Sequence, residues 1–261
     1  MRRIKKCTVF LLVLCLLLNL AGCAAAQKPL RVTLVLKTVT EVAEFWGTLL
    51  SGVEKAAEEY GVELKVLTSP REIDIDKQIE LIRQVTADKP DVMILSAADY
   101  DRCAEATEEA IAAGIGVVAI DTDVNAAGRA CFVGSNSYEI GLEMGRAMAS
   151  YLPEGGKVAV IQHMLTTTTG IERTRGVLDA LNEAGNIEIL GSFCCDNSTE
   201  QAQTITTELL SADPEIRGFV CTNEVCNVGA ANALVELGMG GRVYVVGCDN
   251  SQRQIQFLEQ N

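Results

Sequence analysis

The segment GVVAIDTD, residues 116–123, carries the pattern that decides the fold, because an uninterrupted apolar run ends in an acidic turn. Residues 116–120 hold no charged or polar side chain, which predicts a strand that is buried on both faces. The same layout recurs in VMILS (92–96) and VYVVG (243–247). Strands of this kind are typical of parallel sheets that are covered by helices on both sides.

Amphipathic segments separate these strands, and each is long enough for a crossover helix. They include residues 44–61, 74–88, 137–152, 170–185 and 198–213. Their alternation with strands predicts an α/β fold built from right-handed strand–helix–strand units. Ligands of such sheets bind beyond the carboxyl ends of the strands, where this chain places Ser96, Asp121, Asn223 and Asp249.

The composition limits the kinds of partner. The chain has 261 residues, 48% hydrophobic, and a formal net charge of −13. No Lys/Arg cluster follows the N-terminal segment, which argues against a nucleic-acid partner.

Residues 1–22 have the layout of a bacterial signal peptide: four cations, then an apolar run from Val9 to Leu18 that is too short for an ordinary membrane-spanning helix. The end of this segment, Leu20-Ala21-Gly22-Cys23, resembles a lipobox. We therefore expect cleavage before Cys23, a lipid on its sulfur, and a lipid-anchored linker over residues 23–30. The alternative is an ordinary signal peptide with a cysteine at this position by chance.

Seven cysteines follow Cys23, and an odd number cannot all pair within one chain. No CxxC spacing occurs, so a zinc site is not expected, and no cofactor is indicated. Cys195, Cys221 and Cys248 fall near strand ends in the second half of the chain. Independent buried packing is the favoured interpretation, and a soft-metal site or a redox pair at the floor of a cleft is the alternative.

Six motifs occur in order at strand or helix ends: Phe45-Trp46, Asp121 in AIDTD, Asn136 in FVGSN, Arg173-Thr174-Arg175-Gly176, Asn223-Glu224 and Gly247-Cys248-Asp249. Together they resemble the ribose- and galactose-type (type I) periplasmic sugar-binding proteins of bacterial ABC transporters, over about Arg31 to Asn261. The resemblance implies two lobes, residues 31–135 and 136–261, each a parallel sheet flanked by helices. A ligand would be closed between the lobes by hinge motion.

The resemblance also implies the ligand contacts. Phe45 and Trp46 would sandwich the apolar face of a sugar ring, and Asp121, Arg173, Asn223 and Asp249 would bind its hydroxyls.

The chain departs from the ribose-binding pattern at four positions near this site, which are Lys37, Ser96, Thr122 and Asn197. Lys37, Ser96 and Asn197 are included among the expected ligand-binding residues, and Thr122 replaces an arginine. A cation at Lys37 would favour an acidic or phosphorylated ligand. We therefore do not expect a ribose pocket.

Other interpretations remain open for some residues. Asp121 and Asp249 could cap the helices that follow them. One of Phe45 and Trp46 is expected in the core, because adjacent helical positions point about 100° apart. Arg175 is expected in a structural ion pair and His163 in packing. Residues 166–169 are expected to form a flexible loop that faces the cleft.

The resemblance further implies that relatives continue for several dozen residues beyond this helix, so the second lobe is expected to be incomplete. We expect the sequence to be a fragment, because the rest of the pattern is intact, and the alternative is a degraded relative. The function indicated is an extracytoplasmic lipoprotein, anchored to the bacterial cell membrane, that delivers a carbohydrate-like ligand to an ABC permease. No nucleophile–base pair, phosphate loop or metal motif suggests an enzyme. The alternative is a ligand sensor that reports to a membrane partner such as a histidine kinase.

Overall fold

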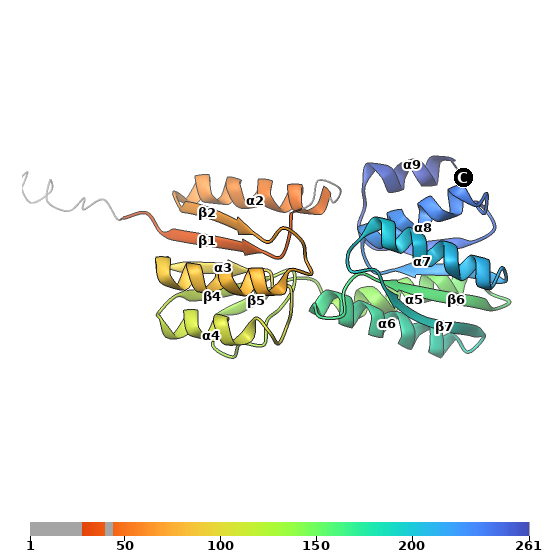
Figure 1. The fold of residues 1–261 in the computed structure, drawn as a ribbon, viewed down its shortest axis with the longest axis horizontal. Helices are drawn as coiled ribbons and strands as arrows, with labels where there is room; N and C mark the ends of the chain where they lie inside the picture. Colours follow the sequence, from red (N-terminus) through yellow and green to blue (C-terminus); the bar gives the residue numbers. More distant parts are fainter. Residues whose placement is uncertain (1–27, 40–43, 261) are drawn as a thin grey trace, which may run out of the picture.

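The computed structural model describes residues 28–39 and 44–260. The expected signal peptide and Cys23 lie outside the described residues. Two parallel sheets stand side by side, each between layers of helices (Figure 1). The α/β fold with helix-flanked parallel sheets, predicted from the sequence, is therefore confirmed.

The first sheet has the strand order β2-β1-β3-β4-β5, and every neighbouring pair is parallel. Its strands are β1 (Arg31–Leu36), β2 (Glu63–Thr68), β3 (Val92–Leu95), β4 (Gly116–Ile120) and β5 (Cys131–Val133), and its helices are α2 (Glu44–Tyr60), α3 (Ile75–Asp88) and α4 (Ala104–Ala112). Strand β1 shows why two helical layers are needed. Leu34 and Leu36 pack with Trp46 of α2 on one face, whereas Val35 packs with the α3 and α4 side on the other.

The second sheet has the order β7-β6-β8-β9 and is also parallel throughout. Its strands are β6 (Gly156–Gln162), β7 (Ile187–Cys194), β8 (Ile216–Cys221) and β9 (Tyr244–Gly247), and its helices are α5 (Ser137–Tyr151), α6 (Thr168–Ala184), α7 (Thr199–Ala212), α8 (Glu224–Glu236) and α9 (Gln252–Gln260). Val160 packs with the α5 and α6 side, and Ile161 packs with the α7 and α8 side.

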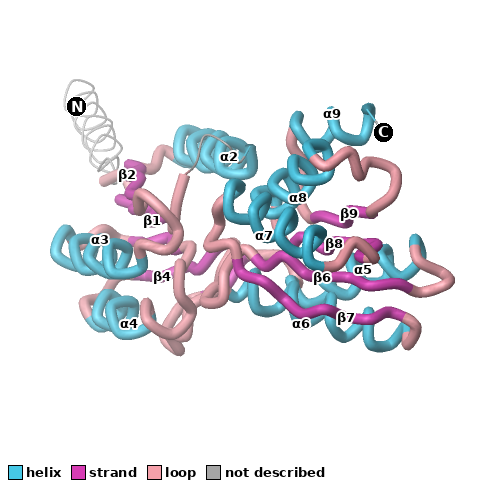
Figure 2. Tube along the Cα trace, turned by 45° about the vertical axis from the view of Figure 1, so that its right-hand side comes forward, coloured by secondary structure: helices cyan, strands magenta, loops and turns pink. Residues whose placement is uncertain are grey.

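The chain passes from the first sheet to the second between β5 and α5, and the proposed boundary at residues 135 and 136 falls in this connection. Both sheets point the carboxyl ends of their strands toward the space between them, as the two views show (Figures 1 and 2). Residues that follow the strands are thereby brought together from distant parts of the sequence.

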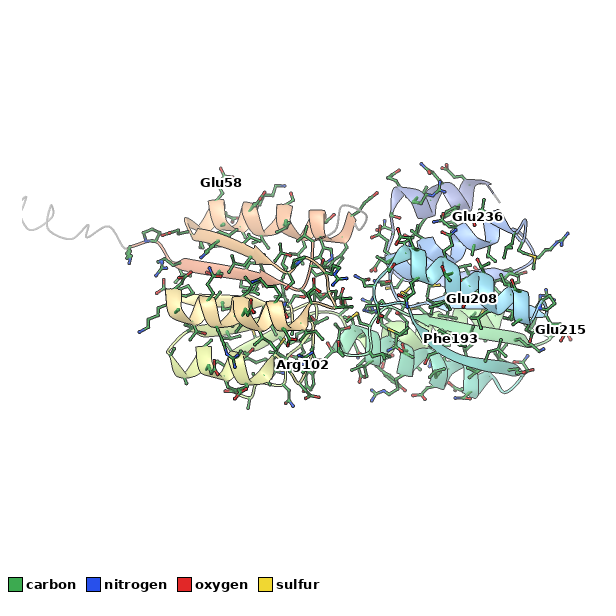
Figure 3. The ribbon with its side chains drawn as sticks, in the orientation of Figure 1. Glu58, Arg102, Phe193, Glu208, Glu215 and Glu236 are labelled. Atoms are coloured by element: carbon green, nitrogen blue, oxygen red, sulfur yellow. The ribbon has the colours of Figure 1, made fainter. Side chains whose placement is uncertain are left out.

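The excess of negative charge is carried in part by the outer faces of the helices. Glu58, Glu208 and Glu236 are exposed on α2, α7 and α8, as Figure 3 shows. Charge placed there keeps a protein soluble and does not define a site. None of the helices within the described residues combines the length and apolar character that crossing a bilayer requires.

The structure corrects the expectation of a flexible loop at residues 166–169. Thr167 is the N-cap of α6, where its side chain accepts a hydrogen bond from the amide of Gly170 at 3.2 Å, and Thr168 and Thr169 lie in the first turn of the helix. Threonine is a favourable N-cap because its hydroxyl satisfies a free amide of that turn. The hydroxyl-rich run is thus a helix start, and only Thr169 lines the cleft.

Candidate ligand-binding cleft

One cleft between the two sheets brings together most of the residues selected from the sequence. It is lined by Lys37, Phe45, Trp46, Asp121, Arg173, Asn197, Asn223 and Asp249, together with Glu72, His163, Thr169, Glu224 and Val225. The first eight were expected as ligand contacts on sequence grounds, and the last five were not, although Thr169 belongs to the run 166–169 that was expected to face the cleft. Ser96 is the one expected contact that does not line the cleft.

Ser96 lies behind the cleft because its side chain turns toward the next strand end. It is fully buried, and its hydroxyl lies 3.3 Å from a carboxylate oxygen of Asp121 and 3.2 Å from the hydroxyl of Thr122. Ser96 therefore supports the side chain of Asp121 and does not contact the cleft itself. Thr122, in turn, is fully buried and donates to the carbonyl of Ala97 at 2.7 Å.

Lys37 directly follows β1 and is neutralised by two carboxylates. Its Nζ lies 2.8 Å from Glu72 and 3.4 Å from Asp121, and its side chain is 5% exposed. Burial lowers the pKa of Lys37, but the charges of Glu72 and Asp121 outweigh this effect and leave the pKa above its ordinary value. Lys37 is therefore charged at neutral pH, and its charge is already compensated.

Three residues of the cleft hold a backbone conformation that non-glycine residues rarely adopt. Asp121, Asn197 and Asp249 have φ angles of 59°, 54° and 68°. Asp and Asn tolerate this left-handed region better than other side chains. Such backbone strain is concentrated at functional sites in proteins, because a turn that aims a polar group inward must be held by its surroundings.

The two aromatic residues have different environments. Trp46 is 5% exposed and belongs to the core beside Leu34 and Leu36, whereas Phe45 is 39% exposed. This agrees with the expectation that one of the pair is a core residue. Their rings meet edge to face, with centroids 5.0 Å apart and an angle of 82° between planes. In this arrangement they do not form two parallel plates around a sugar ring, but both line the cleft.

Arg173 reaches the cleft from α6 because α5 and α6 approach closely. A Cβ atom at Gly141 of α5 would collide with the backbone carbonyl of Arg173, so glycine is required there. The Arg173 side chain donates to the carbonyl of Thr222 at 2.8 Å, and its buried Nε has no hydrogen-bond partner. By contrast, Arg175 is 57% exposed and pairs with Glu172.

His163 follows β6 and is 2% exposed at the base of the cleft. Its Nδ1 lies 2.7 Å from the Thr222 hydroxyl, and its Nε2 lies 3.2 Å from the Thr169 hydroxyl. Burial lowers the pKa of His163 far below its ordinary value, and the positive charges of Lys37 and Arg173 lower it further. The imidazole is therefore neutral. Its packing was expected, but its place in the cleft wall was not.

A series of side-chain hydrogen bonds crosses the cleft from one sheet to the other through two asparagines. Asn223 caps α8 through its side-chain oxygen, which accepts from the amide of Cys226 at 3.0 Å. Its side-chain nitrogen donates to Asn197 at 2.8 Å, and Asn197 donates to Glu72 at 2.8 Å. Glu72 thus joins Lys37 to the second sheet.

Asp249 caps a neighbouring helix and not the helix that follows it. One carboxylate oxygen accepts from the amide of Glu224, the first residue of α8, at 3.1 Å. Helix α9 is capped instead by the hydroxyl of Ser251, which accepts from the amide of Gln254 at 3.3 Å. The side chain of Asp249 is exposed and lines the cleft.

Glu224 is 2% exposed, and both of its carboxylate oxygens lack a partner that meets hydrogen-bond geometry. Burial raises the pKa of Glu224 above its ordinary value. The backbone of Glu44 opposes this rise, and the charge of Asp249 adds to it.

The charges of the cleft do not balance. Four carboxylates line the cleft, those of Glu72, Asp121, Glu224 and Asp249. The cations of the cleft are Lys37 and Arg173, and His163 is neutral. Two negative charges are therefore in excess. An acidic or phosphorylated ligand, suggested by Lys37 in the sequence, is not favoured by this arrangement.

Two of the cleft residues that were not predicted as ligand contacts have a position that the sequence does show. Glu72 and His163 both follow strands, namely β2 and β6, at the same edges as Asp121 and Asp249. The role of Glu72 depends on β2 lying next to β1, which places Glu72 beside Lys37.

The cysteines of the described residues are not grouped as a metal site. Within residues 28–39 and 44–260, no three His, Cys, Asp or Glu side chains are grouped to hold a metal ion. All seven cysteines of this part are free, and Cys103, Cys195, Cys221 and Cys226 are buried.

Comparison with known proteins agrees with this architecture. Residues 33–261 match the family model described as a periplasmic binding protein domain. A D-ribose/D-allose-binding protein of Pseudomonas aeruginosa is 27% identical over 234 residues, which cover 87% of this chain and 72% of the relative. A D-allose-binding periplasmic protein of Escherichia coli is 26% identical over 252 residues, which cover 94% of this chain and 79% of the relative.

Solved structures show the same arrangement. A periplasmic solute-binding protein of an ABC transporter from Actinobacillus succinogenes, with bound D-allose, superposes with a TM-score of 0.80 at 28% identity. The match covers 89% of this chain and 82% of that one.

Proposed function

Because the chain belongs to the periplasmic binding protein family, we propose that it captures a sugar or sugar-like ligand between its two sheets and delivers it to an ABC importer. Like its relatives, it is a binding protein and not an enzyme. One observation carries the proposal: polar side chains from both sheets, together with two aromatic rings, converge on a single cleft.

The chemistry of this cleft suits a polyhydroxylated molecule. Carboxylates accept hydrogen bonds from hydroxyl groups, and a guanidinium donates to hydroxyl or ring oxygens in a fixed geometry. Phe45 and Trp46 offer apolar surface for the CH-rich face of a sugar ring. The contacts assigned to Phe45, Trp46, Asp121, Arg173 and Asp249 remain part of the proposal.

The ligand is proposed to be neutral. The charge of Lys37 is satisfied by Glu72 and Asp121, and the cleft carries an excess of carboxylates. A sugar acid or a sugar phosphate would add to this negative charge in a partly buried site. We expect neutral pentoses, hexoses or polyols to bind more tightly than the corresponding acids.

The relatives named above are named for ribose or allose, and the proposal of a different ligand rests on the departures of this sequence from the ribose-binding pattern. Asn197 stands where an aromatic residue is common in ribose-binding relatives, and it is hydrogen-bonded to Glu72 and Asn223. Thr122 replaces an arginine and is buried. We propose a ligand whose hydroxyl pattern differs from that of ribose.

Calorimetric titration of the purified protein with neutral sugars, polyols, sugar acids and sugar phosphates tests the function. Arg173→Ala should weaken the best ligand by roughly tenfold to a hundredfold, because it removes a charged donor worth about 1.5–3 kcal/mol. Arg175→Ala is the matched control, since Arg175 lies on the same helix but pairs with Glu172 outside the cleft. Failure of every neutral sugar and polyol to bind would contradict the proposal.

We further propose that the protein is a lipoprotein anchored through Cys23 to the extracytoplasmic face of the bacterial cell membrane. The proposal rests on the order of charged, apolar and small residues before Cys23. Cys23→Ser should release the protein from the membrane fraction into the medium, as followed by immunoblotting of cell fractions. Unchanged retention of the variant on membranes would argue against the anchor.

A further inference from the structure

Two of the buried cysteines lie close together directly behind the cleft. The Sγ atoms of Cys195 and Cys226 are 3.4 Å apart, and both side chains are fully buried. Cys195 follows β7, and Cys226 lies in the first turn of α8. The two residues are 31 positions apart in sequence, so their proximity is a product of the fold.

The pair is connected to the cleft through two asparagines. Cys195 precedes Asn197 by two residues, and the amide of Cys226 donates to the side chain of Asn223 at 3.0 Å. Asn197 and Asn223 are joined by a hydrogen bond of 2.8 Å, and both line the cleft. A covalent link between the two cysteines would therefore tie together the two segments that carry these amides.

We propose that Cys195 and Cys226 are a redox-active pair that forms an intramolecular disulfide by exchange with a low-molecular-weight disulfide. A disulfide bond is about 2.05 Å long, so the sulfurs need to approach by roughly 1.3 Å, a distance within reach of small side-chain rotations. Exported proteins are the ones in which such bonds form and persist.

The exchange is balanced in atoms and electrons. The Cys195 thiolate attacks one sulfur of the small disulfide RSSR and expels one RS⁻, which takes up the proton lost by Cys195. The Cys226 thiolate then attacks the Cys195 sulfur of the mixed disulfide and expels the second RS⁻, which takes up the proton lost by Cys226. Two protein thiols and RSSR become one protein disulfide and two RSH, and the two electrons given up by the protein reduce RSSR.

The environment favours Cys195 as the attacking residue. The hydrogen bond with Cys226 lowers the pKa of Cys195 and outweighs the opposite effect of burial. Burial raises the pKa of Cys226, and the hydrogen bond to Cys195 raises it further. The neighbouring Cys221 belongs to the same buried cluster and serves as an internal comparison, because burial raises its pKa and the charge of Cys195 raises it further.

Peptide mapping of the full chain tests the proposal. The protein is incubated in oxidised glutathione, both in its native state and during refolding from denaturant, then alkylated and digested with trypsin. Cleavage after arginine separates residues 176–217, which hold Cys194 and Cys195, from residues 218–242, which hold Cys221 and Cys226. We expect these two peptides to be joined in at least one of the incubations, with fragmentation spectra that place the link at Cys195 and Cys226.

Serine variants separate the four pairings that this digest allows. The linked peptides should disappear in Cys195→Ser and Cys226→Ser and should persist in the matched controls Cys194→Ser and Cys221→Ser. The oxidised wild type should melt above the reduced form by on the order of 5–10 °C, and Cys226→Ser should show no such difference. Absence of the linked peptides after both incubations, or a link at another pair of cysteines, would overturn the proposal.

Discussion

At Asp249 a single carboxylate accepts a hydrogen bond from the first amide of α8 and also faces the cleft. The alternatives considered from the sequence, a helix cap and a ligand contact, are therefore compatible at this residue. The helix concerned is α8, which comes before Asp249 in the chain. A strand-end acid in a parallel sheet reaches the neighbouring helix because strands end and helices begin at the same edge of the sheet.

Asp249→Ala is expected to have two separable effects. Loss of the cap should lower the free energy of unfolding by about 1 kcal/mol, and loss of the acceptor should weaken ligand binding by roughly tenfold to a hundredfold. Asp249→Asn should lose less affinity, because its amide oxygen still accepts. Calorimetry and melting curves check this prediction, with Asn250→Ala as the control. Unchanged affinity in Asp249→Ala would leave Asp249 as a cap alone.

At the scale of the elements, strands such as β3 and β4 were predictable because their apolar runs leave no polar face. The start of α6 was not, since four threonines offer no apolar period and the cap at Thr167 is recognised only once the helix is seen. Glu72, and its hydrogen bond with Asn197, escaped for a different reason. Their hydrogen bond joins residues 125 positions apart in the sequence and on different sheets. Such pairs depend on the packing of the whole fold, which local patterns do not contain.

The first turn of α8 makes a prediction of its own. Glu224 is buried, and this burial raises its pKa above the ordinary value. For an acid with a raised pKa, the protonated form stabilises the fold. This stabilisation is fully present at pH values below the pKa that Glu224 has in the unfolded chain. It is lost as the pH rises through the pKa that Glu224 has in the folded protein.

Glu224→Gln should therefore become more stable than the wild type as the pH rises from about 4 to about 7, by on the order of 1 kcal/mol at the upper end. Urea unfolding at both pH values measures this difference. Glu236→Gln, at the exposed last residue of α8, is the control and should leave the pH dependence of stability unchanged. A wild type that gains stability relative to Glu224→Gln as the pH rises would contradict the assignment.

At the scale of the whole molecule, hydrogen bonds between the described residues join the two sheets on the cleft side at two places. Asn197 donates to Glu72, and the amide of Gln252 donates to Glu44 at 3.0 Å. Closer to the connection between β5 and α5, where the chain crosses from one sheet to the other, Thr166 donates to the carbonyl of Ala98 at 2.9 Å. Contacts near the crossover can persist during a hinge motion, whereas contacts across the cleft must break when it opens.

The bond between Asn197 and Glu72 is therefore expected to influence the balance between open and closed forms. Asn197→Ala removes this bond while leaving the ion pair of Lys37 and Glu72 in place. Without ligand, the variant should populate the open form more and show a larger radius of gyration in solution scattering. Ligand affinity should fall by roughly threefold to tenfold, because closure then costs about 1 kcal/mol more. Asn186→Ala, which alters an exposed amide bonded to Pro153, is the control. If Asn197→Ala has the same radius of gyration and affinity as the control, this bond does not contribute to closure, and the ligand must draw the two sheets together through its own contacts with Asp121, Arg173 and Asp249.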